Sequence, residues 1–273
     1  MNPLDAASPA WPPAGQAGTR LCLSLVTHRQ ARLANQFLAD LQQCQAPDRL
    51  VITSNLPDDV PLQHLPAASE RIDNAAPQGF ARNHNLAFAR SREDFFCVAN
   101  PDIRLPSDPF PGLLARMADP RVGLVAPLVL SPTGAVEDSA RRFPTLTSLA
   151  RKAMGGADGR YTVQPSQAGH AVPVDWVAGM FLLFRAEAFR DVGGFDDKFH
   201  LYYEDVDICA RLWKAGWKVM LSPDVTVVHA AQRASRHDPQ YMAWHASSMA
   251  RYFFKHLGRL PRTSRASGIP PGS

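Results

Sequence analysis

The carboxylates of Glu204, Asp205 and Asp207 stand within four consecutive residues, just after the aromatic pair Tyr202-Tyr203. The residues that follow, 208–213, have apolar side chains at helical spacing, so we expect the acids in the first turn of a helix. The helix dipole favours acidic residues there, and an ordinary capping sequence would look the same. Carboxylates in such a setting are also candidates for catalysis, and we expect an active site here.

A further acidic candidate is Asp102, which follows the apolar run 95–99 in the tripeptide Asn100-Pro101-Asp102. A carboxylate at the end of a strand can hold a divalent ion against a diphosphate. Asn-Pro and Pro-Asp pairs are also ordinary turn sequences, so both interpretations stay open. His229 ends another apolar run, 225–228, and its imidazole is either a second metal ligand or a structural histidine.

Gly79 opens a segment that we expect to begin a helix. The free N–H groups of a helix N-terminus bind phosphates, and Arg82 would add a positive charge. The amides of Asn83 and Asn85 would then meet the phosphates or the sugar of a nucleotide donor. A plain N-cap explains either amide singly, and a solvated Arg82 is the alternative for the guanidinium.

An aromatic residue followed by small residues begins a later apolar run, Trp176-Val177-Ala178-Gly179. A sugar ring stacks well on an indole, so this segment is a candidate wall for a sugar. An ordinary core tryptophan is the simpler alternative, because aromatic residues dominate core burial. Trp176, Ala178 and Gly179 are kept as candidate substrate contacts.

Strand and helix patterns alternate along the first part of the chain, with apolar strand-like runs over 21–26, 50–53 and 95–99. This alternation predicts an α/β fold with a mostly parallel sheet, whose ligands bind beyond the carboxyl ends of the strands. Candidate residues at such ends are Thr27, His28, Asn55 and Asn100. Further strands are expected over 122–130, 181–184, 217–221 and 225–228. An irregular loop that is either mobile or partner-dependent is expected over 131–169.

The 273 residues, of which 45% are hydrophobic, allow one large core. The formal net charge of +4 comes largely from the C-terminal stretch, which favours an anionic surface or substrate; no nucleic-acid partner is expected. Four widely spaced cysteines favour a reducing cytoplasm. Residues 1–18 are expected to form a disordered tail without a secretion signal, and no apolar stretch reaches the roughly 18 residues of a membrane helix.

The segment from Gln240 to Lys255 carries aromatic residues at helical spacing, among them Tyr241, Trp244 and Tyr252. Basic residues form one edge of this stripe. A basic amphipathic helix on an anionic membrane is one interpretation, and a helix packed on the catalytic domain is the other. The pattern favours neither.

Taken in order, these segments resemble family 2 inverting glycosyltransferases over most of residues 20–258. The resemblance rests on Thr27-His28, Gly79-Phe80 with Asn83 and Asn85, Asn100-Pro101-Asp102, Trp176 to Gly179, Gly193-Gly194-Phe195-Asp196, Tyr203 to Asp207, Arg211 and His229. Within that family, Arg141 to Pro144, the approach to Trp176 and the segment from Trp244 to Tyr252 look most like rhamnosyltransferases of bacterial O-antigen and cell-wall assembly.

The resemblance implies a GT-A fold, a Rossmann-like and mostly parallel central sheet flanked by helices, with a small acceptor-side lobe. Residues 19–130 would form the nucleotide-sugar half and 131–258 the acceptor half with the C-terminal helix, before a basic disordered tail over 259–273. The implied donor is a nucleotide-sugar, expected to be dTDP-L-rhamnose. The implied acceptor is a glycan or an undecaprenyl-diphosphate-linked sugar at the cytoplasmic face of the membrane, reached by peripheral contact.

The same resemblance assigns roles to the candidate residues. Asp205 would be the base that deprotonates the acceptor, and Glu204 would position that acceptor. Asp102 with His229 would hold Mg²⁺ or Mn²⁺. Asp207 would cap the helix or pair with Arg211. The implied substrate contacts are Thr27, His28, Asn55, Gly79, Arg82, Asn83, Asn85, Asn100, Trp176, Ala178, Gly179 and Arg211.

Two positions depart from the family pattern. Asn100 stands where the family has the first acid of its Asp-x-Asp motif, and Thr53-Ser54-Asn55 replaces an acidic pair after the second strand. A transferase that uses another UDP-, GDP- or dTDP-sugar and a non-catalytic glycan-binding subunit therefore remain alternatives. A dinucleotide-binding dehydrogenase is disfavoured, because no Gly-x-Gly-x-x-Gly follows the first strand.

Overall fold

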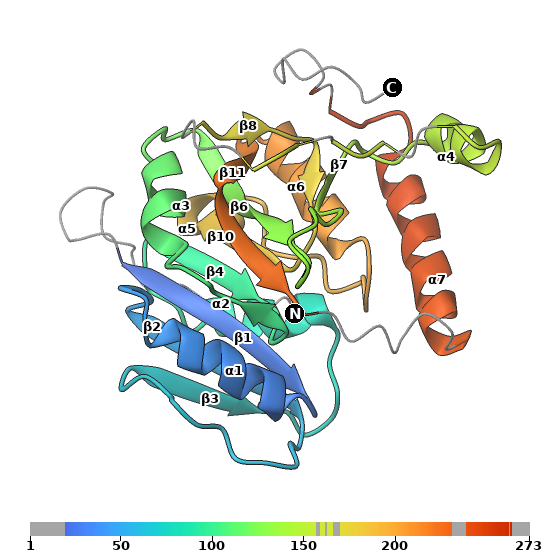
Figure 1. The fold of residues 1–273 in the computed structure, drawn as a ribbon. Helices are drawn as coiled ribbons and strands as arrows, with labels where there is room; N and C mark the ends of the chain where they lie inside the picture. The colour runs from blue at the N-terminus through green and yellow to red at the C-terminus, as the bar shows by residue number, and fades with distance from the viewer. Residues whose placement is uncertain are drawn as a thin grey trace.

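The computed structural model describes residues 20–156, 159–161, 163–165, 170–230, 239–261 and 263. The expected N-terminal tail over 1–18 lies outside these ranges, as does most of the expected C-terminal tail. A large central sheet runs through the molecule with helices on both of its faces (Figure 1). The alternation of strand and helix patterns thus predicted the architecture correctly.

The central sheet has nine strands in the order β3-β2-β1-β4-β10-β6-β11-β5, with β8 paired to β11 as well. The strands β3, β2, β1 and β4 are parallel, and so are β6 and β11. Strand β10 runs antiparallel between β4 and β6, and β5 and β8 run antiparallel to β11. The strand bounds are β1 (Leu21–His28), β2 (Arg49–Leu56), β3 (Ser69–Asp73), β4 (Phe95–Ala99), β5 (Ile103–Arg104), β6 (Val122–Leu130), β8 (Val172–Pro173), β10 (Phe181–Arg185) and β11 (Lys218–His229).

Two cores lie on opposite faces of this sheet, because successive strand residues point to opposite sides. Leu21, Leu23 and Leu25 pack into the core with α1 (Ala31–Leu41) and α3 (Phe110–Arg116). Cys22 and Phe96 pack into the other core. The helices of that second core are α2 (Phe80–Phe88), α5 (Ala186–Asp191) and α6 (Glu204–Lys214). Both faces are covered, which is why the central strands are continuous apolar runs in the sequence.

The expected loop over 131–169 contains more structure than the sequence analysis predicts. It includes β7 (Ala140–Arg141), which pairs with β9 (Trp176–Val177), and helix α4 (Leu146–Ala153). Thr145 caps α4, since its hydroxyl accepts from the backbone of Ser148 while the Ser148 hydroxyl accepts from the backbone of Thr145. This reciprocal cap is a local signal that a helix begins here, even though few apolar residues follow.

Strand β11 is a single element where two strands, 217–221 and 225–228, were predicted. Its register against β6 shifts between Ser222 and Thr226, which marks an irregularity in the ladder. Pro223 lies in that interval, where the missing N–H costs no ladder hydrogen bond. Asp224 accepts from the Ser222 hydroxyl at 2.7 Å and forms an ion pair with Arg116. The expected turn is therefore a bulge inside one long strand, which carries His229 to the edge of the sheet.

Helix α7 (Pro239–His256) packs on the domain through one stripe of side chains. Ser248, Tyr252 and His256 are spaced four residues apart and are buried. His256 Nε2 lies 2.8 Å from Asp207 Oδ1, and Lys255 pairs with both Asp207 and Asp196. One side of α7 is thus fixed to α6, as the packing alternative for this segment requires.

The start of the expected basic tail also touches the domain. Thr263 is buried, and its hydroxyl donates to Asp175, whose other carboxylate oxygen accepts from the backbone of Phe143 at 2.8 Å. Thr263 thus contacts the packed domain, although it lies within the segment 259–273 that is expected to form a tail.

The first turn of α2 rests directly on a distant loop. Phe80 N–H donates to the carbonyl of His200 at 3.2 Å, and a Cβ placed on Gly79 would lie 2.5 Å from that carbonyl oxygen. No real Cβ tolerates such a contact with a backbone atom, so the position requires glycine. Gly79 therefore lets α2 approach the loop that leads into α6.

Replacing this glycine tests the contact. Gly79→Ala is expected to lower the free energy of unfolding by about 1–3 kcal/mol, because the new methyl must push the His200 carbonyl away. Hydrogen exchange over 193–203 should become faster. Gly134→Ala is the control, since its φ of +81° costs strain while no atom lies within 4 Å of the added Cβ. Equal exchange over 193–203 in the two variants would contradict the assigned role of Gly79.

Candidate active site

The chain enters α6 through an unusual backbone conformation. Tyr202 and Tyr203 have φ angles of 70° and 68°, in the left-handed region. Consecutive bulky residues rarely adopt these angles, and such strain concentrates at functional sites. The two tyrosines turn the chain so that the helix begins at Glu204, with Asp205 and Asp207 in its first turn.

The carboxylate of Asp205 is held by two neutral backbone amides. Gly179 N–H donates to Oδ2 at 3.1 Å, and Val206 N–H donates to Oδ1 at 2.8 Å. Burial raises the pKa of Asp205, while these amides act in the opposite direction. A partly buried carboxylate with a raised pKa and a fixed orientation has the properties of a general base.

Glu204 differs from its neighbour although the two are adjacent. Its side chain is buried, and its Oε2 has no hydrogen-bond partner among the described residues. Burial and the nearby charge of Asp205 raise the pKa of Glu204 well above its ordinary value. This raised pKa favours the protonated, neutral form of Glu204 beside Asp205.

The turn Ala178–Met180 connects the base to the end of β4. Gly179 gives its N–H to Asp205, and the carbonyl of the next residue, Met180, accepts from Asn100 N–H at 2.9 Å. A Cβ on Gly179 would meet the ring of Phe80 at 3.2 Å and Cβ of Asp205 at 3.8 Å. The structure thus brings Ala178, Gly179, Asn100 and Asp205 together at one edge of the sheet.

Asp102 and His229 meet at the same edge, where β5 pairs with the end of β11. His229 Nε2 lies 3.2 Å from Asp102 Oδ2, and His229 Nδ1 lies 2.8 Å from Glu137 Oε2. Burial lowers the pKa of His229, but the hydrogen bonds with Asp102 and Glu137 outweigh it and raise the pKa to about 9. The imidazole is thus oriented by a carboxylate on each side.

These residues fit a divalent cation of the kind the sequence predicts. Asp102 Oδ1 is buried and has no hydrogen-bond partner among the described residues, and it belongs to the carboxylate beside Nε2 of His229. Within the same residues, no group of three or more His, Cys, Asp and Glu side chains is arranged around a common point, because Glu137 bonds the far nitrogen of the ring. Two protein ligands suit Mg²⁺ or Mn²⁺ when substrate phosphates complete the shell.

The carboxyl ends of β1 and β2 form a second polar group. Asn55 has a saturated side chain: Nδ2 donates to the Gln78 carbonyl and to His28 Nδ1, and Oδ1 accepts from Asn74 and from Gln78 N–H. The Gln78 N–H can only donate, which fixes the orientation of the amide. His28 Nδ1 is then an acceptor, so the neutral ring carries its proton on Nε2 and can present it to a ligand.

The side chains of Asn83 and Asn85 form hydrogen bonds within the protein. Asn83 accepts from Asn74 at 2.7 Å, and Asn85 both donates to the carbonyl and accepts from the N–H of Phe195. Asn85 also donates to Asp197 at 2.6 Å. Both amides are buried, so they hold the loops around α2 where the sequence analysis expects substrate contacts. Arg82 on the same helix is exposed.

Trp176 and Arg211 also make contacts within the protein. Trp176 is partly buried, and its indole N–H donates to the Arg142 carbonyl at 2.9 Å. Arg211 donates from Nε to Asp207 at 2.7 Å and from Nη1 to the carbonyl of Val192. Asp207 therefore pairs with Arg211, as one alternative predicts, and Arg211 connects the first turn of α6 to the end of α5.

Sequence reasoning missed Asp58 and Glu137. Asp58 accepts from the Thr27 hydroxyl at 2.8 Å and from Ala31 N–H at 3.0 Å, so it ties the end of β1 to the start of α1. The sequence held a signal for Asp58, because two acids follow Asn55 closely in Leu56-Pro57-Asp58-Asp59. Glu137 carries no local signal, since its partner His229 is 92 residues away.

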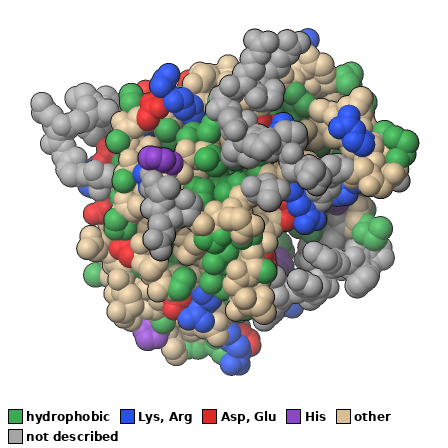
Figure 2. Space-filling view, turned by 45° about the horizontal axis from the view of Figure 1, so that its top comes forward, with side chains coloured by type: hydrophobic (Ala, Val, Ile, Leu, Met, Phe, Trp, Pro, Cys, Tyr) green, Lys and Arg blue, Asp and Glu red, His purple; other side chains and the backbone are tan. Residues whose placement is uncertain are grey.

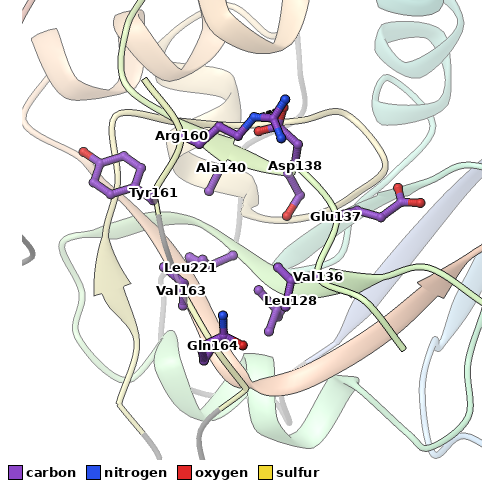
Figure 3. Close-up of a pocket in the computed structure, with 11 residues that line it drawn as sticks. Leu128, Val136, Glu137, Asp138, Ala140, Arg160, Tyr161, Val163, Gln164 and Leu221 are labelled. Atoms are coloured by element: carbon purple, nitrogen blue, oxygen red, sulfur yellow. Dashed lines mark ion pairs between the residues drawn. The ribbon is translucent and has the colours of Figure 1, made fainter. Parts of the chain in front are cut away.

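A pocket of about 150 Å³ lies beside Glu137 (Figure 3). Its apolar lining includes Leu128, Val163 and Leu221, and the Glu137 carboxylate points away from these side chains. The hydroxyl of Ser139, another lining residue, is buried without a hydrogen-bond partner in the described part of the chain. The Ser139 carbonyl accepts from Ala178 N–H at 2.8 Å, so the pocket adjoins the turn that holds Asp205.

Comparisons with known proteins agree with this arrangement. A family model described as "Glycosyl transferase family group 2" matches residues 101–248. An N-acetylglucosaminyl-diphospho-decaprenol L-rhamnosyltransferase of Mycobacterium tuberculosis is 36% identical over 168 residues, 57% of this chain and 53% of the relative. The chain therefore spans about half the length of that relative. Rhamnosyltransferase WbbL of Escherichia coli is 27% identical over 240 residues, 84% of this chain and 90% of the relative.

Solved structures are similar in fold. A mannosyltransferase from Pyrobaculum calidifontis, in complex with GDP-Man and Mn²⁺, matches with a TM-score of 0.58 and 18% identity over 92% of this chain and 66% of that one. GalNAc-T7 with UDP, GalNAc and Mn²⁺ matches with a TM-score of 0.60 and 12% identity, over 81% of this chain and 45% of that one. Both are glycosyltransferases of the GT-A fold, so the predicted fold class is confirmed. No helix in the described ranges is long and apolar enough to cross a bilayer.

The raised pKa of Glu204 makes stability depend on pH. Between the unfolded value, near 4.5, and the higher folded value, the native state holds a proton that the unfolded chain releases. Stability therefore falls as pH rises through this window. Glu204→Gln removes the titration, so the variant is expected to gain stability over the wild type at about pH 8 and to lose most of that gain at about pH 4. Thermal unfolding across this range measures the difference, and a gain that does not change with pH would contradict the assignment.

Proposed function

The chain belongs to glycosyl transferase family group 2, and from this premise we propose that it transfers L-rhamnose from dTDP-L-rhamnose to a lipid-linked sugar with inversion at the anomeric carbon. The observation that carries the proposal is the placement of Asp205. The Gly179 N–H holds its carboxylate. The carbonyl of the next residue, Met180, accepts from the N–H of Asn100 at the end of β4. A base and a phosphate-binding edge are then neighbours, as single displacement requires.

The relatives support the choice of sugar. Two rhamnosyltransferases match this chain at 36% and 27% identity, and the second aligns over 84% of it. The solved neighbours bind GDP-Man or UDP, so another nucleotide-sugar is the second candidate donor on the same fold. The proposed domain division keeps 19–130 as the donor half and 131–258 as the acceptor half.

We assign the proton transfer to Asp205. As the acceptor hydroxyl oxygen bonds to the anomeric carbon, its proton passes to the Asp205 carboxylate, and the bond from that carbon to the diphosphate oxygen breaks. The nucleoside diphosphate leaves with the electron pair of that bond. The raised pKa of Asp205 increases its affinity for that proton. The pKa of Glu204 is raised well above its ordinary value, which favours Asp205 over Glu204 as the ionised acid of the pair.

The cation would bind to Asp102 and His229. A bound Mg²⁺ or Mn²⁺ supplies charge neutralisation for a departing diphosphate. Asp102 offers the unpartnered Oδ1, His229 offers Nε2 after loss of its proton, and Glu137 fixes the ring through Nδ1. The backbone N–H of Asn100 donates to the carbonyl of Met180. The neutral side-chain amide of Asn100 would then contact the donor where the family has an acidic side chain.

The acceptor is proposed to be a sugar on a polyprenyl diphosphate at the cytoplasmic face of the membrane. The mycobacterial relative is described as acting on a diphospho-decaprenol, which is a lipid-linked substrate of this kind. A soluble glycan is the alternative acceptor. The pocket beside Glu137 is a candidate place for part of the acceptor, because it adjoins the turn that holds Asp205.

Removing the proposed base tests the mechanism. Asp205→Asn is expected to lower kcat by about 10²–10⁴-fold while leaving donor affinity nearly unchanged, because the amide keeps the shape but cannot take a proton. Release of nucleoside diphosphate should be measured with dTDP-rhamnose, UDP-sugars and GDP-sugars, with membrane lipid extract and Mg²⁺ or Mn²⁺ present.

Asp197→Asn is a suitable control. Asp197 lies on the loop before α6 and accepts from Asn85, and among the described residues it makes no hydrogen bond to the turn that holds Asp205. It should retain most of the activity. Full turnover by Asp205→Asn would show that another group is the base. Release from a donor other than dTDP-rhamnose would overturn the rhamnosyl assignment, and donor binding without any turnover would favour a non-catalytic glycan-binding subunit.

The orienting role of Glu137 can be tested by metal binding. Glu137→Gln is expected to weaken Mn²⁺ binding by about 10–100-fold, because the His229 ring loses the carboxylate that fixes it. Titration of Mn²⁺ followed by electron paramagnetic resonance measures this without any turnover. Asp138→Asn is the matched control, since Asp138 pairs with Arg141 and Arg160 instead of His229. Equal Mn²⁺ affinity in the two variants would rule out the role of Glu137.

A further inference from the structure

Exposed apolar side chains gather on two helices of the acceptor half. Seven large hydrophobic residues are exposed in the described part of the chain, and five of them lie on or directly after α4 and α7. Their exposed fractions reach 81% for Met154 and 90% for Phe254. The five residues are Leu146, Met154, Met242, Phe254 and Leu257.

The exposed side of α7 is opposite to the side that packs. Tyr252 and His256 are buried against the domain, and Phe254 lies two residues from each, about 200° around the helix. Arg251 and Leu257 lie three residues on either side of Phe254, so they share its outward face. Both are exposed. Near its C-terminal end, this outward face of α7 therefore carries two large apolar residues beside a basic one.

Helix α4 begins beside α7. The Tyr252 hydroxyl donates to the carbonyl of Pro144 at 3.4 Å, directly before the capping residue Thr145. None of the described side chains of α4 is buried, and an isolated helix of eight residues is marginal in water. The helix ends in the exposed basic pair Arg151 and Lys152. A partner that covers the apolar side of α4 would supply the packing that the domain does not.

The charge of this surface has one sign. The segments 139–156 and 239–263 contain no Asp or Glu, while Arg151, Lys152, Arg251 and Arg259 are exposed there. In Figure 2, Lys and Arg side chains adjoin hydrophobic ones on the side of the molecule where Figure 1 places α4 and α7. Exposed apolar residues bordered by cations match the interface of an anionic bilayer, where the rings and methyl groups enter and the cations meet phosphate.

We propose that α4 and the outward face of α7 dock this protein onto an anionic lipid bilayer. The inference rests on the proposed function, since a polyprenyl-diphosphate acceptor is held in such a bilayer. It deepens that function by naming the surface that meets the membrane. Docking would also cover the apolar side of α4. The bilayer would then be the partner on which the segment within 131–169 depends.

Binding to vesicles tests the proposal in the absence of any donor or acceptor. The full chain should sediment with vesicles that contain phosphatidylglycerol and remain in solution with pure phosphatidylcholine. Phe254→Ser should weaken binding by about tenfold or more, because a fully exposed ring is removed without loss of packing. Leu65→Ser, at an exposed apolar residue in the loop between β2 and β3, is the matched control and should bind like the wild type.

The cations are tested separately. Arg151→Gln with Lys152→Gln should weaken binding by on the order of tenfold, and added salt should weaken wild-type binding as well. Arg32→Gln with Arg71→Gln removes the same charge from exposed residues elsewhere and should have little effect. The proposal would be overturned if the wild-type protein did not bind anionic vesicles, or if the control variants lost as much binding as the variants of the proposed surface.

A second copy of the chain is the competing occupant of this surface. If Phe254→Ser converts a dimer to a monomer in light scattering while vesicle binding is unchanged, the surface is a protein interface and the proposal is wrong. The proposed function is judged apart from this, because rhamnosyl transfer to a water-soluble acceptor analogue should be equal in the wild type and in Phe254→Ser.

Discussion

The placement of strand β10 is the constraint on which the candidate active site depends. It runs antiparallel between β4 and β6, so it starts at the edge where β4 ends. The turn before it, Ala178–Met180, therefore lies against Asn100. In the same turn, the Gly179 N–H donates to Asp205 and the Ala178 N–H donates to the carbonyl of Ser139. One reversal of direction in the sheet thus joins the end of β4, the segment that carries Ser139 and the first turn of α6.

The three acids of that first turn show how environment separates identical chemistry. Asp207 is fully buried but pairs with His256, Arg211 and Lys255, and these partners outweigh burial and lower its pKa well below the ordinary value. Glu204 is buried without such partners, and its pKa rises. Asp205 is held only by amides. A structural anchor, an acid with a strongly raised pKa and a candidate base therefore lie within four consecutive residues.

Amide side chains near the carboxyl ends of β1 and β2 form hydrogen bonds with one another. Asn74 donates to both Asn55 and Asn83, and Asn55 in turn fixes Gln78 and His28. Such a saturated network is rigid, because each broken bond would leave a buried polar group unpaired. The groups left free to meet a nucleotide are then outward-facing ones, such as Nε2 of His28 and the Arg82 guanidinium.

The sequence by itself determined the architecture and the positions of the chemistry. Apolar runs are local properties, so they predicted β1, β2, β4 and β6 and placed Thr27, Asn55 and Asn100 at strand ends. Two elements were missed: β3 has a single apolar residue, and α3 is short and contains Pro111 and Gly112. The orientation of each side chain was decided only by tertiary structure. Asn83, Asn85 and Arg211 have the residue types of ligand contacts yet bond to other groups of the protein, and Asn85 does so across 112 residues. Glu137 gains its role only where folding brings it to His229. Hydrogen bonds between residues far apart in sequence leave no local pattern, so only the fold reveals which polar groups are used internally.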